Sequence, residues 1–407
     1  MVNLVPALDE LESLTDPERQ VLGLLDNDEI VAFHRGLVQI PSVNPPGDVR
    51  EAIAYCESPL KYAGFGTEIV AMDPTMPSLI ARYGRHSGPV LAFNAHVDVV
   101  PIGDRAAWNH EPFGAEIVEG RIYGRGAGDD KASVTAQVMA GIALARSGVE
   151  LQGQLIVNEV ADEESAGFRG TGFVVEQGYF KPDFVIVGEQ TFNTVAVGEK
   201  GGSPTRIVVR GRTAHGALPW EGANAIEGLA EVIVALRREY WPVLAKRTHD
   251  LFLPSSASVN LVEGGVKTNV VPDFASAYVD RRLIPGESPA EVLDELREIA
   301  TAAVADMPGI SVEVEEVWPG GAATATPVDS PLVLTMVDAN RRLGLPETLR
   351  GFSMATDGRF FARQEIPTII YGPGDPGLAH VPDEWVGIDE LIQATRAYTL
   401  AALSLLA

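Results

Sequence analysis

Apolar and polar residues follow two different rhythms along this chain. Up to about residue 198, short and almost continuous apolar runs, such as PVLAFNAHV at 89–97, are separated by segments with helical apolar spacing, such as 131–148. The continuous runs predict strands buried on both faces, and the helical spacing predicts amphipathic helices. Alternating strands and helices of this kind predict an α/β layered domain with a largely parallel sheet.

The rhythm changes near Gly198, and residues 203–211 alternate like a half-exposed strand. The order that follows is strand, helix, strand, strand, helix, strand, which is typical of a small α+β sandwich. We therefore expect 199–317 to be an inserted second domain. Residues 1–198 and 318–407 then form the two segments of the first domain.

The individual elements follow from the same patterns. Helices are expected at 17–40, 131–148, 169–178, 223–241, 288–305, 330–344 and 389–407. Strands are expected at 66–72, 78–84, 89–97, 154–162, 184–189, 203–211, 257–264, 274–283, 310–318 and 367–372.

Composition narrows the class of protein. The length of 407 residues and an apolar content of 46% favour a folded protein of two domains. The 31 basic and 56 acidic residues give a net charge of −25, which repels nucleic acids and anionic membranes, so neither is expected as a partner. The single Cys56 excludes an internal disulfide and a multi-thiolate zinc site. No apolar run reaches the length of a membrane span and no signal peptide is visible, so a cytoplasmic protein is expected.

Histidines and carboxylates stand where the predicted strands end or in the loops that follow them. The candidates for metal ligands are His96, Asp129, Glu164, Glu189 and His380. Ligands in an open α/β sheet bind at the carboxyl ends of the strands, and this set suits zinc or another first-row divalent ion. Five side chains are too many for one tetrahedral ion and fit two ions that share a bridging carboxylate. Asp129, between a glycine-rich turn and a helix start, is the best candidate for the bridge.

Two neighbouring acids are of the right type for chemistry. Asp98 could accept a hydrogen bond from the imidazole of His96 and fix its orientation. Glu163, next to Glu164, is the candidate general base that moves a proton from water to the leaving amine. Asp162, in the same acidic triplet, is expected to be solvated.

Each of these motifs has a structural explanation when taken alone. An HxD pair is usually a polar strand end, and acidic triplets are usually solvated loops. The glycine run 124–128 could be read as a phosphate-binding loop, but the two aspartates that follow would repel a phosphate. Jointly, in this order and at strand ends, the motifs are difficult to explain as structure.

The ordered set HVDVVP, YGRGAGDDK, ADEESAG, GE, TAHGALPWEGANAI and AHVPDE resembles the co-catalytic zinc amidohydrolase family. That family includes acetylornithine deacetylase, succinyl-diaminopimelate desuccinylase, aminoacylase and glutamate carboxypeptidase, and the resemblance runs from about residue 30 to the end. It implies a layered catalytic domain with an inserted dimerisation domain, a homodimer, and two zinc ions per chain, with cobalt or manganese as substitutes. One zinc would be held by His96, Asp129 and Glu189, and the other by Asp129, Glu164 and His380.

The resemblance also implies roles in the inserted domain. His215 would reach the active site of the partner subunit and stabilise the oxyanion, whereas without the resemblance it would be a loop histidine that caps a helix. Substrate contacts are expected from Asn269, Arg282, Gly372 and Gly374, with Arg282 clamping a carboxylate and the glycines admitting substrate to the backbone. Arg281 would point to the other strand face, towards solvent.

A few further positions depart from the family motif or lie near it. Asp130 stands where the family commonly has Met, and could alter the local field or face Lys131. Asp357 and Arg359 are expected to be structural with a substrate role. Asp130 and Trp220, which is near the His215 loop, are candidate specificity elements, although a packing role is expected for Trp220.

The sequence therefore predicts a metal-dependent hydrolase that cleaves an amide of an N-acyl amino acid, or a related amide with a free carboxylate, by a zinc-bound hydroxide with Glu163 as base. A dipeptidase or carboxypeptidase of the same family is the main alternative, and a xenobiotic amide or carbamate hydrolase is another. A non-catalytic binding protein is disfavoured by the complete ligand set. A nuclease or phosphatase is disfavoured by the charge of −25.

Overall fold

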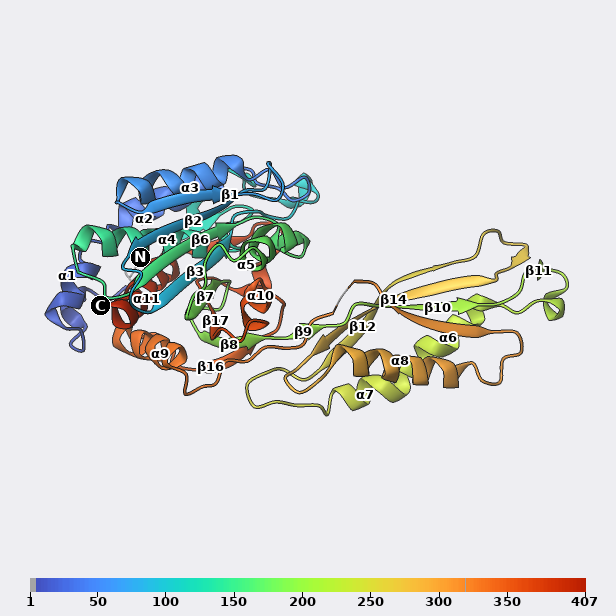
Figure 1. Cartoon of the computed structure of the whole chain (residues 1–407). Helices are drawn as coiled ribbons and strands as arrows, with labels where there is room; N and C mark the ends of the chain where they lie inside the picture. The colour runs from blue at the N-terminus through green and yellow to red at the C-terminus, as the bar shows by residue number, and fades with distance from the viewer. Residues whose placement is uncertain (1–4, 319) are drawn as a thin grey trace. The chain divides into compact units, whose positions relative to one another are not determined.

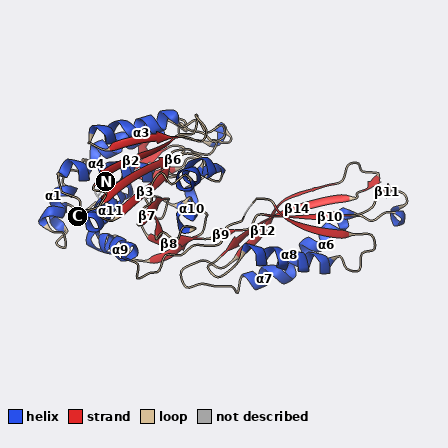
Figure 2. Ribbon diagram, in the orientation of Figure 1, coloured by secondary structure: helices blue, strands red, loops and turns tan. Residues whose placement is uncertain are grey.

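The computed structural model describes residues 5–318 and 320–407, which divide into two compact units (Figure 1). Unit 1 consists of Met1–Gly198, Thr326–Arg350 and Thr356–Ala407, and unit 2 consists of Glu199–Ala325 with Gly351–Ala355. The range expected for the inserted domain, 199–317, lies within unit 2. Figure 2 shows helices and strands in both units.

The larger sheet has eight strands in the order β1-β2-β6-β3-β7-β17-β8-β16. Their bounds are β1 Gly66–Val70, β2 Ser78–Gly84, β3 Val90–His96, β6 Gln154–Val160, β7 Phe184–Gly188, β8 Val195–Glu199, β16 Leu349–Phe352 and β17 Thr368–Tyr371. The central strands β6, β3, β7 and β17 run parallel, as expected. The pairs β1–β2, β2–β6 and β8–β17 are antiparallel, so the sheet is mixed.

Helices enclose the centre of this sheet. Helix α4 (Lys131–Ser147) packs on α11 (Ile388–Leu406), and both contact β3 and β6. Helix α10 (Gly358–Ala362) contacts β7 and β17. Every residue of β6 and β17 is buried, including the polar Gln154, Asn158 and Glu159 of β6, whereas β17 is apolar apart from its first residue and a tyrosine.

The expected helix at 17–40 is wrong as a single element. The structure has α1 at Asp16–Leu22 and α2 at Asn27–Val38. The Asp26 carboxylate accepts hydrogen bonds from the backbone N–H groups that follow it, so a new helix begins there. Apolar spacing continues across the break, which hides it from the sequence pattern.

Two other expected helices are also interrupted. Residues 169–178 form a π-helical turn at Phe168–Gly172 and then α5 (Phe173–Glu176). Residues 223–241 form α6 (Ala225–Ala235), a π-helical turn at Leu236–Tyr240 and α7 (Trp241–Leu244). The remaining helices are α3 (Arg50–Tyr62), α8 (Pro289–Ala303) and α9 (Pro331–Leu343).

Unit 2 contains an antiparallel sheet in the order β12-β14-β10-β15. The strands are β10 Thr205–Arg210, β12 Ser256–Gly264, β14 Phe274–Leu283 and β15 Ser311–Glu316, and β9 (Gly201–Gly202) also pairs with β14. Side chains from β10, β14, α6 and α8 form its core, including Ile207, Leu229, Ala277 and Leu296. The sequence order of strands and helices is the one expected.

The short strands form two further pairings. Strands β4 (Glu116–Val118), β5 (Arg121–Tyr123) and β18 (Trp385–Gly387) form one small sheet. Strand β11 (Ala214–His215) pairs with β13 (Val270–Val271) in unit 2.

Arg281 in β14 was expected to face solvent, and this is wrong, because its side chain is completely buried. Its guanidinium pairs with Glu287 and lies 5.9 Å from the centre of the Tyr240 ring. An alternating strand predicts that one face is polar, but a buried ion pair can occupy the core face when its partner comes from the following turn.

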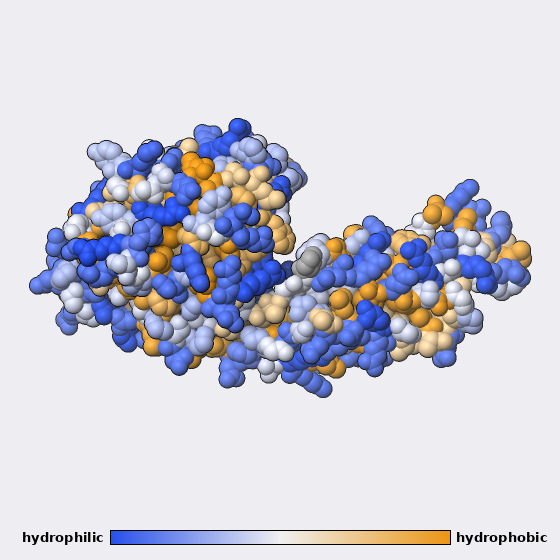
Figure 3. All heavy atoms as spheres, viewed as in Figure 1, coloured by the Kyte–Doolittle hydropathy of each residue, from blue (hydrophilic) through white to orange (hydrophobic). Residues whose placement is uncertain are grey.

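Trp220 was expected to pack, but its side chain is 71% exposed in the chain as described. It lies in a short 3₁₀ turn, Pro219–Glu221, that follows the His215 strand. Hydrophilic residues cover much of the face shown in Figure 3, as the net charge of −25 requires. Within the described ranges, no helix combines the length and the apolar character needed to cross a membrane.

His34 on α2 gives the fold a testable pH dependence. Its side chain is fully buried, Nδ1 lies 3.0 Å from Thr135 Oγ1, and burial lowers its pKa to about 4. The unfolded chain therefore takes up this proton first, near pH 6.5. The stability that neutral His34 contributes is complete above about pH 6.5 and is lost as the pH falls towards 4, by about 3 kcal/mol in total.

We expect His34→Asn to flatten the fall in unfolding free energy between pH 6.5 and pH 4, measured by urea unfolding at several pH values. His86→Asn replaces an exposed histidine and should leave the pH dependence of the wild type. Equal slopes for wild type and His34→Asn would contradict the assignment.

Candidate metal and catalytic site

The four parallel strands bring the candidate ligands to one edge of the sheet in unit 1. His96 is the last residue of β3, and Glu189 directly follows β7. Glu164 follows β6 in a 3₁₀ turn, and His380 lies in the loop after β17. Asp129 stands two residues before α4. The carboxyl ends of parallel strands meet at the same edge, so segments far apart in sequence converge there.

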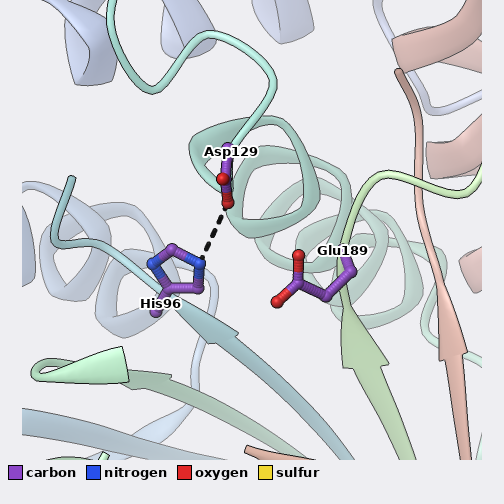
Figure 4. A group of neighbouring side chains, drawn as sticks. All are labelled: His96, Asp129 and Glu189. Carbon is purple, nitrogen blue, oxygen red and sulfur yellow. Dashed lines mark ion pairs between the residues drawn. The ribbon is translucent and has the colours of Figure 1, made fainter. Parts of the chain in front are cut away.

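His96, Asp129 and Glu189 form the first group. Their side chains point towards a common centre in Figure 4, and His96 Nε2 lies 3.3 Å from Asp129 Oδ1. One ligand atom from each residue lies within 4.8 Å of the others. All three residues are buried.

Asp129, Glu164 and His380 form the second group. His380 Nε2 is 3.3 Å from Asp129 Oδ2 and 3.1 Å from Glu164 Oε2. The ligand atoms again lie within 4.8 Å of one another. Asp129 thus directs one carboxylate oxygen towards each group, which is the geometry of a bridging ligand.

The donor atoms fit divalent metal ions. His96 Nε2 and Glu164 Oε1 are buried and have no hydrogen-bond partner among the described residues. Buried polar atoms without partners are costly, and a cation would satisfy them. Two imidazoles and three carboxylates without a thiolate suit first-row divalent ions, zinc among them.

Electrostatics in the site favour added positive charge. Burial raises the pKa of Glu189 well above its usual value, and the nearby carboxylates of Asp129 and Asp130 raise it further. Burial lowers the pKa of His96, but the Asp129 carboxylate, 3.3 Å from Nε2, and the neighbouring acids outweigh that effect and hold it well above normal. The crowding of these carboxylates thus favours binding of a proton or of a divalent cation.

Asp98 supports the first group through its backbone. Its carbonyl oxygen, and not its carboxylate, lies at hydrogen-bond distance from His96 Nδ1, at 2.9 Å against 3.7 Å for Oδ1. The other carboxylate oxygen accepts from Asn44 Nδ2 at 2.9 Å and from the Glu164 N–H at 3.4 Å. The expected contact between the imidazole and the Asp98 side chain is therefore replaced by a contact to its carbonyl.

Glu163 lies in the same turn as Glu164, directly after Asp162. Burial raises its pKa well above the ordinary value, and the Asp357 and Glu164 carboxylates add to this. Asp162 was expected to be solvated, which is wrong, since it is buried and pairs with Arg169 at 3.0 Å. Its left-handed backbone, with φ of 72°, forms the turn that carries Glu163.

Asp357, directly before α10, and Arg359, within α10, contact the segment that follows this same turn. Arg359 Nη2 donates to the Ala166 carbonyl at 2.7 Å. Asp357 is buried against Gly167, where any Cβ would lie 2.0 Å from its Oδ1. Both residues therefore support the segment that carries Glu163 and Glu164.

Asp130 does not pair with Lys131. Its carboxylate is fully buried, whereas Lys131 Nζ donates to the Ile40 carbonyl at 2.7 Å. Burial raises the pKa of Asp130 to about 8, and Asp129 contributes to the rise. Asp130 is thus one of the carboxylates gathered at the edge of the sheet where the candidate ligands lie.

His215 and Asn269 lie together in unit 2, because His215 ends β11 and Asn269 directly precedes β13, the strand that pairs with β11. The Ala217 N–H donates to His215 Nδ1 at 3.1 Å, and the Gly216 N–H donates to the Asn269 carbonyl at 2.8 Å. The first bond leaves the neutral imidazole with its proton on Nε2, so the exposed nitrogen is a donor.

Arg282 follows buried Arg281 and is about one third exposed. Its Nε donates to Asp280 Oδ1 at 2.9 Å, in an ion pair with the residue two positions earlier. The Arg282 guanidinium is accessible to solvent, but it is already bound to the Asp280 carboxylate.

The structure requires glycine at positions 372 and 374 for two different reasons. A Cβ at Gly372 would lie 2.4 Å from Ser133 Oγ and 2.5 Å from the Glu189 carbonyl, so its close approach is to the protein itself. Gly374 has φ of +98°, a conformation that favours glycine. Both requirements arise within the protein and do not involve a substrate.

Sequence reasoning missed two residues inside motifs it had used. Glu384, in AHVPDE, and Arg125, in GRGAGDD, form a buried ion pair of 2.6 Å beside Asp129. The only sequence signal for this pair is the opposite charge of its two residues. A buried ion pair and two solvated charged residues cannot be told apart from the sequence.

Comparison with known proteins agrees with this geometry. The model of Peptidase family M20/M25/M40 matches residues 92–404. The chain is 30% identical over 390 residues to the succinyl-diaminopimelate desuccinylase of Methylorubrum populi, covering 90% of this chain and 96% of that protein.

Two solved structures share the fold. A tripeptidase from Staphylococcus aureus has a TM-score of 0.76 at 21% identity, covering 94% of this chain and 99% of that chain. A dinuclear metal binding peptidase from the M20 family of Bacillus subtilis has a TM-score of 0.70 at 19% identity, covering 93% and 98%.

The family match spans more than half of the chain and includes all five candidate ligands. The resemblance inferred from the ordered motifs is therefore confirmed at the level of the family and the fold. The chain belongs to peptidase family M20/M25/M40 and is a hydrolase of amide bonds.

Proposed function

We propose that this chain hydrolyses the amide bond of an N-acyl amino acid, or of a related amide that carries a free carboxylate, with two zinc ions per chain. The observation that carries the proposal is the pair of ligand groups that share Asp129. The similarity over most of the chain to a protein named succinyl-diaminopimelate desuccinylase supports an acyl substrate of this class.

The residues around the two groups have complementary roles. The two groups, His96, Asp129 and Glu189 and Asp129, Glu164 and His380, would hold two divalent ions, which would supply Lewis acidity to the substrate carbonyl and to water. Glu163, which stands next to Glu164 in the turn after β6, accepts the proton of the attacking water and returns it to the leaving amine. Asp98 orients His96 through its carbonyl oxygen.

His215 is the proposed donor to the oxyanion. The Ala217 N–H fixes its tautomer, so Nε2 can donate a hydrogen bond as negative charge develops on the carbonyl oxygen. Asn269, Arg282 and the backbone at Gly372 and Gly374 are proposed to contact substrate. The carboxylate of the substrate would replace Asp280 on the guanidinium of Arg282.

We propose a homodimer in which His215 serves the partner's site. Strand β12 lies at the edge of its sheet, and Leu261 and Val262 on it are 51% and 55% exposed. An open edge with exposed apolar side chains is suited to pairing with a second copy.

The proposed function is tested by hydrolysis of N-succinyl and N-acetyl amino acids and of free dipeptides, alongside zinc content. We expect about two ions per chain and turnover of the N-acyl substrates that chelation abolishes. Faster turnover of dipeptides would favour the dipeptidase alternative, and metal without turnover of either class would favour a xenobiotic amide or carbamate. A chain without metal and without turnover would contradict the proposal.

Glu163→Gln removes the proposed base but preserves shape. We expect a loss of about 10²-fold to 10⁴-fold in kcat with zinc content close to that of the wild type. Glu176→Gln, an exposed substitution on α5, is the control and should retain activity. An active Glu163→Gln variant would remove Glu163 from the mechanism.

Complementation tests the role of His215 across a dimer. Glu163→Gln and His215→Ala should each be inactive alone, but mixed dimers contain one site with both groups intact. With random exchange half of the dimers are mixed, and one of their two sites is complete, so about a quarter of the wild-type activity should return. No recovery, despite subunit exchange shown by mass spectrometry, would place His215 in its own chain's site or outside the mechanism.

A further inference from the structure

The carboxylate of Glu384 is buried in unit 1 and is surrounded by donors from a single loop. Oε1 accepts the backbone N–H of Gly128 at 2.8 Å and that of Asp129 at 2.9 Å. Oε2 accepts the Gly126 N–H at 3.1 Å and Arg125 Nη1 at 2.6 Å. Its side chain has no exposed surface. One carboxylate therefore binds four donors within a loop of five residues.

These contacts determine how Asp129 is presented. Because the N–H groups of Gly128 and Asp129 both point at Oε1, the backbone that carries the Asp129 side chain is held in one orientation. From there the Asp129 carboxylate reaches His96 Nε2 and His380 Nε2, at 3.3 Å each.

The same ion pair also holds the segment that carries the second histidine. Glu384 lies four residues after His380, and its own carbonyl accepts the Gly124 N–H at 2.9 Å. Arg125 Nη1 donates to the Val381 carbonyl at 3.3 Å, directly after His380. The Asp129 loop therefore donates hydrogen bonds to the backbone of the His380 loop as well as to the Glu384 side chain, and the two loops are joined at several points.

We propose that Glu384 and Arg125 are a positioning pair that fixes Asp129 relative to His380 and so sets the affinity of the chain for its metal ions. The inference rests on the two-ion site of the proposed function. Neither side chain is a ligand, so the effect on the ions is exerted through the backbone of Asp129 and the loop of His380.

The alternative is that the pair only stabilises the fold, and unit 2 supplies a matched control. Arg281 and Glu287 also form a buried ion pair, with side-chain exposures of 0% and 11%. Among the described residues of unit 2, none belongs to either group of candidate metal ligands. Breaking either pair should lower the melting temperature, but only the first should change metal binding.

The experiment measures zinc affinity by chelator competition on folded, purified full-length variants, with thermal unfolding in parallel. In the wild type both carboxylate oxygens of Glu384 accept hydrogen bonds. The Gln side chain in E384Q has an NH₂ group in place of one oxygen, and this group cannot accept, so at least one donor of the loop loses its acceptor. We expect E384Q to bind zinc about 10-fold to 100-fold more weakly than wild type. E287Q should keep wild-type zinc affinity, and Asp129→Ala should lose zinc and confirm that the assay reports on this site.

R125K keeps the positive charge beside Glu384 and provides a milder variant if E384Q does not fold. We expect a measurable weakening of zinc binding that is smaller than that of E384Q. Wild-type affinity in E384Q, or in R125K where only that variant folds, would overturn the positioning role. Equal weakening in E287Q would also overturn it, because a general loss of stability would then explain the effect. A wild-type chain that binds no zinc would instead overturn the proposed function, and this inference with it.

Discussion

Crowding of buried carboxylates at the carboxyl edge of four parallel strands is the constraint that the rest of the site depends on. Asp129, Glu164 and Glu189 converge there, and burial together with their mutual repulsion raises the pKa values of the last two. The buried cation Lys131 is directed to a backbone carbonyl, not to these acids. Such an arrangement is stable only with bound protons or bound cations, and the two sets of converging donor atoms favour cations.

Holding these acids together requires a rigid frame. The strands supply one side of it, with β6 and β17 buried throughout. The loops supply the other through hydrogen bonds that use no ligand atom, since Glu384 holds the Asp129 loop and Arg359 holds the turn after β6. A frame held by contacts that use no ligand atom lowers the cost of arranging the ligands around an ion.

The sequence predicted the central strands and the candidate ligands because both follow one rule. Each ligand comes after an apolar run or at a helix start, and parallel strands gather these positions at one edge. The rule fails where a local polar contact decides the structure. Asp26 begins a new helix within continuous apolar spacing, and Glu287 draws Arg281 into the core from the next turn. The pairing of Glu384 with Arg125 joins positions 259 residues apart, which no local pattern contains.

In the proposed function, different parts of the chain set the reaction class and the substrate class. The ligand edge belongs to unit 1, whereas Arg282, the proposed carboxylate clamp, belongs to unit 2. Its present partner Asp280 is 39% exposed, and ion pairs of this exposure contribute only about 0–1 kcal/mol. Replacing Asp280 by a substrate carboxylate on Arg282 would therefore change the electrostatic free energy very little. Arg282 already holds Asp280 by two bonds, from Nε to Oδ1 at 2.9 Å and from Nη2 to Oδ2 at 3.1 Å. A substrate carboxylate on the proposed clamp would take over both bonds, so selectivity would depend on how the rest of the substrate is held.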